Sequence, residues 1–194
     1  MEQRIGCIVM AAGLASRYGA NKLLETLDGR TLIERTLDTV PLEAFAAAAV
    51  VAWHPDILAL AERRGFLAVE NDRPRDGASR TVRLGLQALP PCDGALFLVA
   101  DQPMLQRRSV EAVLRRWQED PSRIVGLGRG GRRGNPCLFP SSLFPELMAL
   151  EGDRGGSAVI QRHGDLLVLV EAAEEELLDV DVPETLRKFQ EKGR

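Results

Sequence analysis

The sequence has little cysteine, and the three cysteines form no recognisable pattern. Cys7, Cys92 and Cys137 are odd in number and widely spaced, and no C-x-x-C pair occurs. This spacing argues against a disulfide framework and against a zinc site, and it fits a reducing cytoplasm. Cys7 lies inside an apolar run, so we expect it to be a small residue of the core.

Long apolar runs and a strong charge of one sign are also missing. No apolar stretch approaches the roughly 20 residues that span a membrane, and the N-terminus has no basic region followed by an apolar signal core. A net charge of −3, with 27% charged residues, gives no support for general nucleic-acid binding. With 194 residues, 45% of them hydrophobic, we expect one soluble cytoplasmic domain over residues 1–194, without a nucleic-acid or membrane partner.

Two common glycine motifs of nucleotide-binding proteins are absent as well. The chain has no Gly-Lys-Ser/Thr ending of a Walker loop, and Gly13 and Gly19 are too far apart for G-x-G-x-x-G. Residues 8–24 instead read IVMAAGLASRYGANKLL, an apolar strand candidate followed by a loop of small residues. Small residues let backbone N–H groups approach an anion, and Arg17 and Lys22 would neutralise oxygens beyond their reach. The loop therefore favours a triphosphate over a neutral ligand.

Short apolar runs alternate with helical patterns along the chain. Strands are predicted at residues 5–10, 46–53, 66–69, 95–100 and 124–127, and helices at residues 31–40, 57–64, 79–88 and 109–119. Thr31 begins a capping box, and Ser79 and Ser109 are predicted N-caps. Nearly continuous apolar strands separated by helices predict a parallel sheet that is covered on both faces.

Two further segments place carboxylates at defined points. Asp101 ends the apolar run of residues 95–100, and a carboxylate beyond the carboxyl end of such a strand suits Mg²⁺. A cap on the following turn is the alternative role for this residue. Asp179 and Asp181 alternate with apolar residues, so we expect both on one face of an extended strand, with Pro183 in the first turn of a final helix. Capping that helix is the alternative role for Asp179.

The loop at residues 11–24 resembles the signature A-A-G-x-x-x-R-x-G-x-x-K-L-L of nucleotidyltransferases. Within that superfamily the chain is most similar to the MobA-like group, and especially to the MocA-type molybdenum cofactor cytidylyltransferases. Residues 101–104 resemble the metal-binding D-Q-P-M motif of the group, and residues 179–185 resemble its D-I-D-T-P-E-D closing motif. The matching motifs follow one another in the family order over most of the chain.

Three other stretches resemble the group less closely. Residues 77–86 are similar to G-x-S-x-S-L-R-x-G-L, but Arg80 and Thr81 replace the usual Ser-Ser run. Residues 134–140 match G-N-P-x-L-F-P, which lines the acceptor side, and residues 152–157 match G-D-x-G but lack the Arg that ends G-D-x-G-A-R. Arg154 is the candidate to replace that Arg. A hairpin turn and a helix entry are the structural alternatives for the last two stretches.

The resemblance implies a three-layer α/β/α Rossmann-like fold with a mostly parallel sheet, and a Mg²⁺-dependent nucleotidyltransferase. Its implied catalytic residues are Lys22, Arg17 and Asp101. The implied nucleotide contacts are Ala11, Ala12, Gly13, Ser16, Arg17, Lys22 and Ser79. The implied acceptor contacts are Asn135, Pro136, Asp153 and Arg154, and the implied Mg²⁺ ligands are Asp101 and Asp181. We expect these two carboxylates to come from the ends of separate strands and to share one ion.

The implied substrates are CTP and molybdopterin or its molybdenum-loaded form, with a molybdoenzyme as a possible client of the product. Guanylyl-transferring relatives typically read L-A-G-G where this chain has Ala12 before Gly13, which favours CTP over GTP. Guanylyl transfer, transfer to another small phosphate and a non-catalytic cofactor carrier are the alternatives. The basic stretch at residues 129–133 is either a solvated loop or a clamp for a phosphorylated acceptor. His54 and His163 match no motif.

Overall fold

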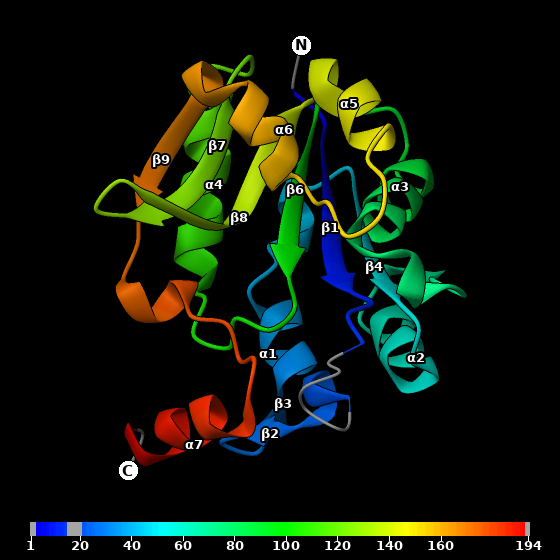
Figure 1. Cartoon of the computed structure of the whole chain (residues 1–194), viewed down its shortest axis with the longest axis vertical. Coiled ribbons are helices and arrows are strands. Elements are labelled where there is room, and N and C mark those ends of the chain that lie inside the picture. The colour runs from blue at the N-terminus through cyan, green and yellow to red at the C-terminus, as the bar shows by residue number, and fades with distance from the viewer. Residues whose placement is uncertain (1–2, 15–20, 193–194) are drawn as a thin grey trace.

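A seven-stranded sheet forms the centre of the computed structural model, which describes residues 3–14 and 21–192 (Figure 1). The sheet has the order β5-β4-β1-β6-β8-β7-β9. Its strands are β1 (Ile5–Ala11), β4 (Ala47–Ala52), β5 (Leu67–Glu70), β6 (Gly94–Val99), β7 (Ile124–Arg129), β8 (Arg132–Pro140) and β9 (Leu167–Glu171). Only β8 runs antiparallel to its neighbours within this sheet, so the mostly parallel arrangement is confirmed.

Helices cover both faces of the sheet. They are α1 (Leu32–Asp38), α2 (Pro55–Arg63), α3 (Ala78–Ala88), α4 (Arg107–Glu119), α5 (Phe144–Met148), α6 (Ser157–Arg162) and α7 (Pro183–Lys192). Because side chains alternate along a strand, Cys7 and Val9 of β1 pack with α1, α2 and α4, whereas Ile8 packs with α3, α5 and α6. In Figure 1, α6 lies in front of the sheet and α4 lies behind it. The three-layer fold is therefore confirmed.

The predicted strands and helices of the first two thirds of the chain are present, with ends shifted by a few residues. The prediction omits β8 and β9. Arg132, Gly134 and Pro136 interrupt the apolar pattern of β8, so only its second half has the composition of a buried strand. Cys7 is fully buried, as expected. In the described part of the chain, no helix is long and apolar enough to cross a bilayer.

Two predicted helix caps are wrong, and tertiary contacts explain both. Gly77, with a φ of 86°, precedes α3, and a Cβ there would lie 2.4 Å from the carbonyl oxygen of Gly152. Ser79 is therefore inside the first turn. Gln106 precedes α4, and its N–H donates to the distant carboxylate of Glu176 at 3.1 Å, so the predicted cap Ser109 also lies inside the helix. The capping box at Thr31 is present.

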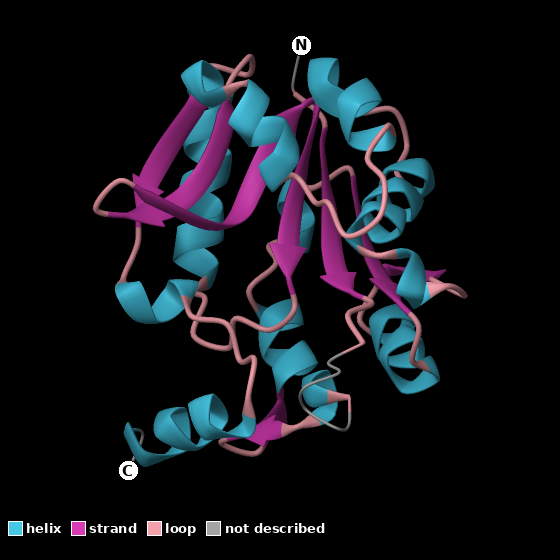
Figure 2. Ribbon diagram, viewed as in Figure 1, coloured by secondary structure: helices cyan, strands magenta, loops and turns pink. Residues whose placement is uncertain are grey.

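A small second core holds the C-terminal segment under the sheet. The hairpin of β2 (Thr26–Leu27) and β3 (Arg30–Thr31) turns at Asp28 and Gly29, both at positive φ. Its apolar side packs against the end of the chain through Leu27, Leu32, Val180, Leu186 and Phe189. Figure 2 shows α7 beside this hairpin, below the ends of β1 and β6. This packing brings the C-terminal segment near Lys22.

Candidate active site

Strand pairing brings two motifs that are distant in the sequence to one edge of the sheet. In the parallel pair of β1 and β6, Met10 lies opposite Val99, and the N–H of Ala100 donates to the carbonyl of Met10 at 3.3 Å. The arrowheads of both strands point to the same edge in Figure 2. The small-residue loop and Asp101 therefore leave the sheet side by side, where ligands of open α/β sheets bind.

Lys22 forms the centre of the charged site. Its Nζ lies 2.7 Å from Oδ2 of Asp101 and 3.4 Å from Oδ1 of Asp181. The Lys22 side chain is only 12% exposed, against 22% for Asp101 and 62% for Asp181. Burial lowers the pKa of Lys22, but the attraction of the two carboxylates outweighs it, so the pKa is raised above the ordinary value. Lys22 therefore remains a fixed cation at neutral pH.

Asp181 does not come from a strand. Residues 178–181 form an irregular segment that ends just before α7, so the prediction of an extended strand on the sheet is wrong. The N–H of Val180 donates to the carbonyl of Asp101 at 2.9 Å, and the Val180 side chain is buried in the small second core. These two contacts, rather than strand pairing, turn Asp181 toward Lys22. The two carboxylates still meet at one ammonium group, as the shared site requires.

Asp179 adds a third carboxylate beside this pair, and no pattern in the sequence assigns it a partner. Gln102 donates through Nε2 to Asp179 Oδ1 at 2.9 Å and to the carbonyl of Leu177 at 3.3 Å. Burial, together with the negative charges of Asp101 and Asp181, raises the pKa of Asp179 to about 6. The Gln102 contact holds the 177–179 segment against the end of β6 and concentrates negative charge around Lys22.

A cavity of about 540 Å³ opens beside Lys22 at this edge, and we call it the first pocket. Of the site residues expected from the sequence, it is lined by Ala12, Gly13, Lys22, Asp101 and Asp153. It is also lined by Pro74, Arg75 and Thr81, which the sequence analysis does not assign to a site. The first pocket therefore has residues 12–14 on one side and the start of α3 on another.

Four expected nucleotide contacts do not line the first pocket or cannot be placed. Ala11 and Ser79 are buried behind its wall, and the Ser79 hydroxyl has no hydrogen-bond partner among the described residues. The backbone N–H of Ser79 donates to the carbonyl of Gly152 at 3.2 Å. Ser16 and Arg17 lie outside the described residues. Their roles stay predictions.

Arg80 and Thr81, where the chain departs from the family pattern, support the wall of the first pocket. Arg80 donates through Nε to Oδ1 of Asn71 at 3.0 Å, and Asn71 donates through Nδ2 to the hydroxyl of Thr81 at 3.2 Å. Arg80 also forms an ion pair with Asp72. Asn71 is fully buried. The network fixes the turn that carries Pro74 and Arg75 to the first turn of α3.

A smaller cavity of about 190 Å³, the second pocket, adjoins the first and shares Met10, Ala78 and Val99 with it. Its other walls are Val82, Phe97, Arg133, Asn135, Cys137, Phe139, Leu147, Gly155, Gly156, Ser157 and Ile160. Asn135 thus faces this pocket, and it precedes a cis peptide bond to the buried Pro136. Pro136, Asp153 and Arg154, the other expected acceptor contacts, do not line this pocket.

Asp153 and Arg154 lie elsewhere. Asp153 lines the first pocket and accepts the N–H of Ala78 at 3.3 Å through Oδ1. Arg154 lines a separate hollow together with Glu146 and Arg162. His54 caps α2 by accepting the N–H of Asp56, and His163 bonds to Glu146. Neither histidine belongs to the pockets at the strand edge.

The charged residues around Lys22 suit a divalent ion that needs few protein ligands. Among the described residues, no group of three or more His, Cys, Asp and Glu is arranged to hold a metal. Two carboxylates, Asp101 and Asp181, do converge on one point beside the first pocket. Mg²⁺ typically takes one or two carboxylates and completes its shell with waters and substrate phosphates. The donor set therefore fits such an ion.

Comparison with known protein families identifies the family to which this chain belongs. The model of the MobA-like NTP transferase domain matches residues 7–166. The chain belongs to this family. It is accordingly a member of the nucleotidyltransferases, a class of enzymes that generally uses divalent metals. A comparison with proteins of curated function finds no match.

Solved structures support the same fold for this MobA-like chain. A nucleotidyl transferase from Methanothermobacter, Mth528, is 25% identical, covers 98% of each chain and has a TM-score of 0.81. Rv0371c of Mycobacterium tuberculosis H37Rv, solved in complex with manganese, is 25% identical over 97% of this chain and 98% of its own, with a TM-score of 0.73. A CMP:2-keto-3-deoxy-manno-octonic acid synthetase, solved with CTP, is 16% identical over 98% of each chain, with a TM-score of 0.73. At this low identity the last match concerns the fold alone.

Proposed function

We propose that this protein transfers CMP from CTP to a molybdopterin-type acceptor and releases pyrophosphate, with Mg²⁺ as its metal. The observation that carries the proposal is the contact of Lys22 with Asp101 and Asp181 at the mouth of the first pocket. A cation and two carboxylates beside a loop of small residues suit a triphosphate with its divalent ion. The MocA-type resemblance supports the choice of acceptor.

The reaction needs no covalent enzyme intermediate. An oxygen of the acceptor phosphate attacks the α-phosphorus of CTP, the bond from that phosphorus to the β-bridging oxygen breaks, and pyrophosphate leaves with the electron pair. A new phosphate–phosphate linkage joins CMP to the acceptor. The enzyme contributes positioning and charge neutralisation, which are the main sources of catalysis in phosphoryl and nucleotidyl transfer.

Each residue of the charged site has a role in this scheme. Lys22 faces the phosphates as a fixed cation and stabilises the negative charge that develops on them. Asp101 and Asp181 would hold Mg²⁺, and the bound ion would neutralise phosphate oxygens. Gly13 has no side chain, and a Cβ on it would meet no heavy atom of the described residues within 4 Å, which leaves room beside the backbone for a ligand.

Ala12 supports the preference for CTP. It lines the first pocket and is 4% exposed, so its methyl group occupies space that a glycine would leave free. A pyrimidine needs less room than a purine. The CTP-bound synthetase of the same fold shows that this architecture serves a cytidylyl donor in another protein. A molybdoenzyme that receives the product is the partner that this function predicts.

The test is a transfer assay with a panel of nucleoside triphosphates. The purified protein is incubated with molybdopterin, MgCl₂ and either CTP, GTP, ATP or UTP, and pyrophosphate release and product mass are measured. We expect pyrophosphate and a cytosine dinucleotide product with CTP, and no release when molybdopterin is omitted. A larger kcat/KM with GTP would assign guanylyl transfer instead. Binding of molybdopterin without release of pyrophosphate from any triphosphate would assign a cofactor carrier and contradict the proposed function.

A further inference from the structure

Arg133 is a half-buried cation at the wall of the second pocket, and among the described residues it contacts a hydroxyl, a carbonyl and a thiol. Its Nη2 donates to Ser157 Oγ at 2.7 Å, and its Nη1 donates to the carbonyl of Gly134 at 3.3 Å and contacts Cys137 Sγ at 3.5 Å. These three contacts come from β8 and from the start of α6. They fix the guanidinium on one side of the pocket.

Among the described residues, no acidic side chain forms an ion pair with Arg133. Many other arginines here have such a partner. An arginine carries five N–H donors, and the three named contacts leave others for a ligand. A half-buried cation without a counter-charge attracts an anionic group, and the planar donors of arginine fit a carboxylate or phosphate.

The rest of the second pocket is apolar. Phe97 and Phe139 meet edge to face, with ring centroids 5.7 Å apart, and Val82, Leu147 and Ile160 complete the wall. A volume of about 190 Å³ has room for a small ring system but not for a nucleotide together with it. The walls therefore favour a flat body, while Arg133 and Asn135 provide polar contacts.

The contact between Arg133 and Ser157 also accounts for a departure from the family pattern. Ser157 stands where the G-D-x-G-A-R pattern has its Arg, and Arg154, the candidate from the sequence, lines a different hollow. The guanidinium of Arg133 reaches within 2.7 Å of the Ser157 hydroxyl. A cation is thus present at that point of the pocket, but it is supplied by β8 instead of α6.

We propose that Arg133 recognises the acceptor in the second pocket and selects a flat ring that carries an anionic substituent. This inference rests on the proposed function, because it names the class of acceptor for that site. The shared wall of Met10, Ala78 and Val99 joins the acceptor's ring in the second pocket to the nucleotide in the first. The sequence predicts the basic stretch 129–133 to be either a solvated loop or a clamp for the acceptor. In this proposal Arg133 binds the acceptor, and Arg132 is exposed to solvent.

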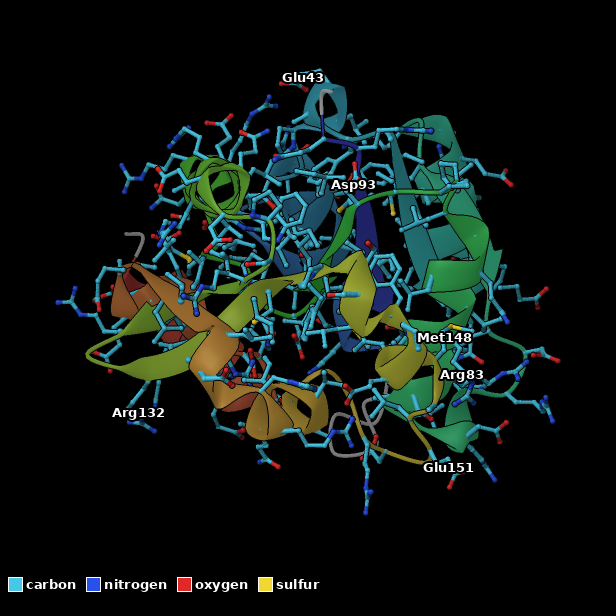
Figure 3. All side chains as sticks on the ribbon, turned by 90° about the horizontal axis from the view of Figure 1, so that it is seen from above. Glu43, Arg83, Asp93, Arg132, Met148 and Glu151 are labelled. Atoms are coloured by element: carbon cyan, nitrogen blue, oxygen red, sulfur yellow. The ribbon has the colours of Figure 1, made fainter. Side chains whose placement is uncertain are left out.

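A binding experiment tests this role without the transfer reaction. The probe is pterin-6-carboxylate, which is flat, anionic and fluorescent, and unsubstituted pterin is its neutral match. Both are titrated into the wild type and into three variants: Arg133→Ala, Arg132→Ala and the exchange Arg133→Ser with Ser157→Arg. Arg132 is exposed, and Figure 3 shows it pointing away from the body of the molecule, so its variant removes the same charge outside the pocket. Circular dichroism and CTP titration verify the fold and the first pocket.

We expect Arg133→Ala to weaken binding of pterin-6-carboxylate roughly tenfold or more, since a hydrogen bond to a charged group is lost. Arg132→Ala should leave the affinity unchanged, the exchange variant should restore most of it, and pterin itself should bind all four proteins alike. Equal losses in both single variants, or no binding of the carboxylate to the wild type, would overturn the proposal. If these binding results hold while the wild type transfers no nucleotide, the proposed function falls and the role of Arg133 in anion recognition stands.

Discussion

The two adjoining pockets at the carboxyl edge of the sheet differ in their walls more than in their position. The first pocket, about 540 Å³, gathers Lys22, Asp101 and Asp153 around a small-residue loop. The second, about 190 Å³, is mostly apolar and has one arginine. Fixed charge stabilises charge that changes during a reaction, whereas apolar walls recognise shape. Under the proposed function, the first pocket would hold the reacting phosphates and the second would hold the body of the acceptor.

The pockets also differ in how the fold builds them. The first forms where the parallel strands β1 and β6 end side by side. The second depends on β8, which pairs antiparallel with β6 and places Cys137 and Phe139 on the face covered by α5 and α6. Gly77 connects the two regions, since its backbone packs against Gly152 in the loop that leads to α6.

The sharpest test of the comparison is removal of charge from the first pocket. Lys22→Ala should lower kcat by roughly 10²–10³, about 3–4 kcal/mol, because a preorganised cation is lost where negative charge develops. Turnover of CTP is measured by pyrophosphate release. Lys188→Ala, which removes an exposed lysine of α7, is the matched control and should keep normal turnover. Near-normal activity of a folded Lys22→Ala protein would remove Lys22 from the mechanism.

The two carboxylates should differ in the size of their effect. Asp101→Asn is expected to lower activity by more than the roughly 10–100-fold that loss of an outer metal partner costs, and to raise the Mg²⁺ concentration needed for half-maximal rate. Asp181→Asn should follow the same direction more weakly, because Asp181 is 62% exposed and lies farther from Lys22. Magnesium titrations of both variants give the measurement. An unchanged Mg²⁺ requirement in Asp101→Asn would contradict the shared metal site.

A change at Gly77 should disturb both pockets together. Gly77→Ala combines a positive φ of 86° with a Cβ 2.4 Å from backbone atoms of Gly152, so we expect a loss of about 3 kcal/mol in the free energy of unfolding. Gly29→Ala has a similar φ of 78° and no heavy atom within 4 Å of the added Cβ, so it should cost only about 1–2 kcal/mol. Urea unfolding measures both. Equal losses would show that close packing of the two loops is unimportant.

The smallest expected effect concerns the base. Ala12→Gly should raise kcat/KM for GTP relative to CTP by several-fold, corresponding to about 1 kcal/mol for one buried methyl group. The ratio is measured in the transfer assay for the wild type and the variant. If the wild type already uses GTP as well as CTP, the methyl group of Ala12 is not the determinant of donor choice.

Local patterns in the sequence predict the first pocket better than the second. The apolar run before Gly13 and the one before Asp101 predict two strands of one parallel sheet, and parallel strands end at a common edge. Lys22 and Asp101 are therefore placed by local patterns and the resemblance together. Asp181 is placed differently, because its position depends on the burial of Val180 in a core formed by distant residues.

The sequence by itself determined the α/β class, the small-residue loop and the carboxylate after β6, since each depends on short-range periodicity and on residues close together in the chain. Only the tertiary structure decided the second pocket, the Gln102–Asp179 contact and the approach of Arg133 to Ser157. Arg133 and Ser157 are 24 positions apart in the sequence, and Gln102 and Asp179 are 77 positions apart. Their contacts depend on which strands pair and which loops pack together, and no local pattern encodes that choice.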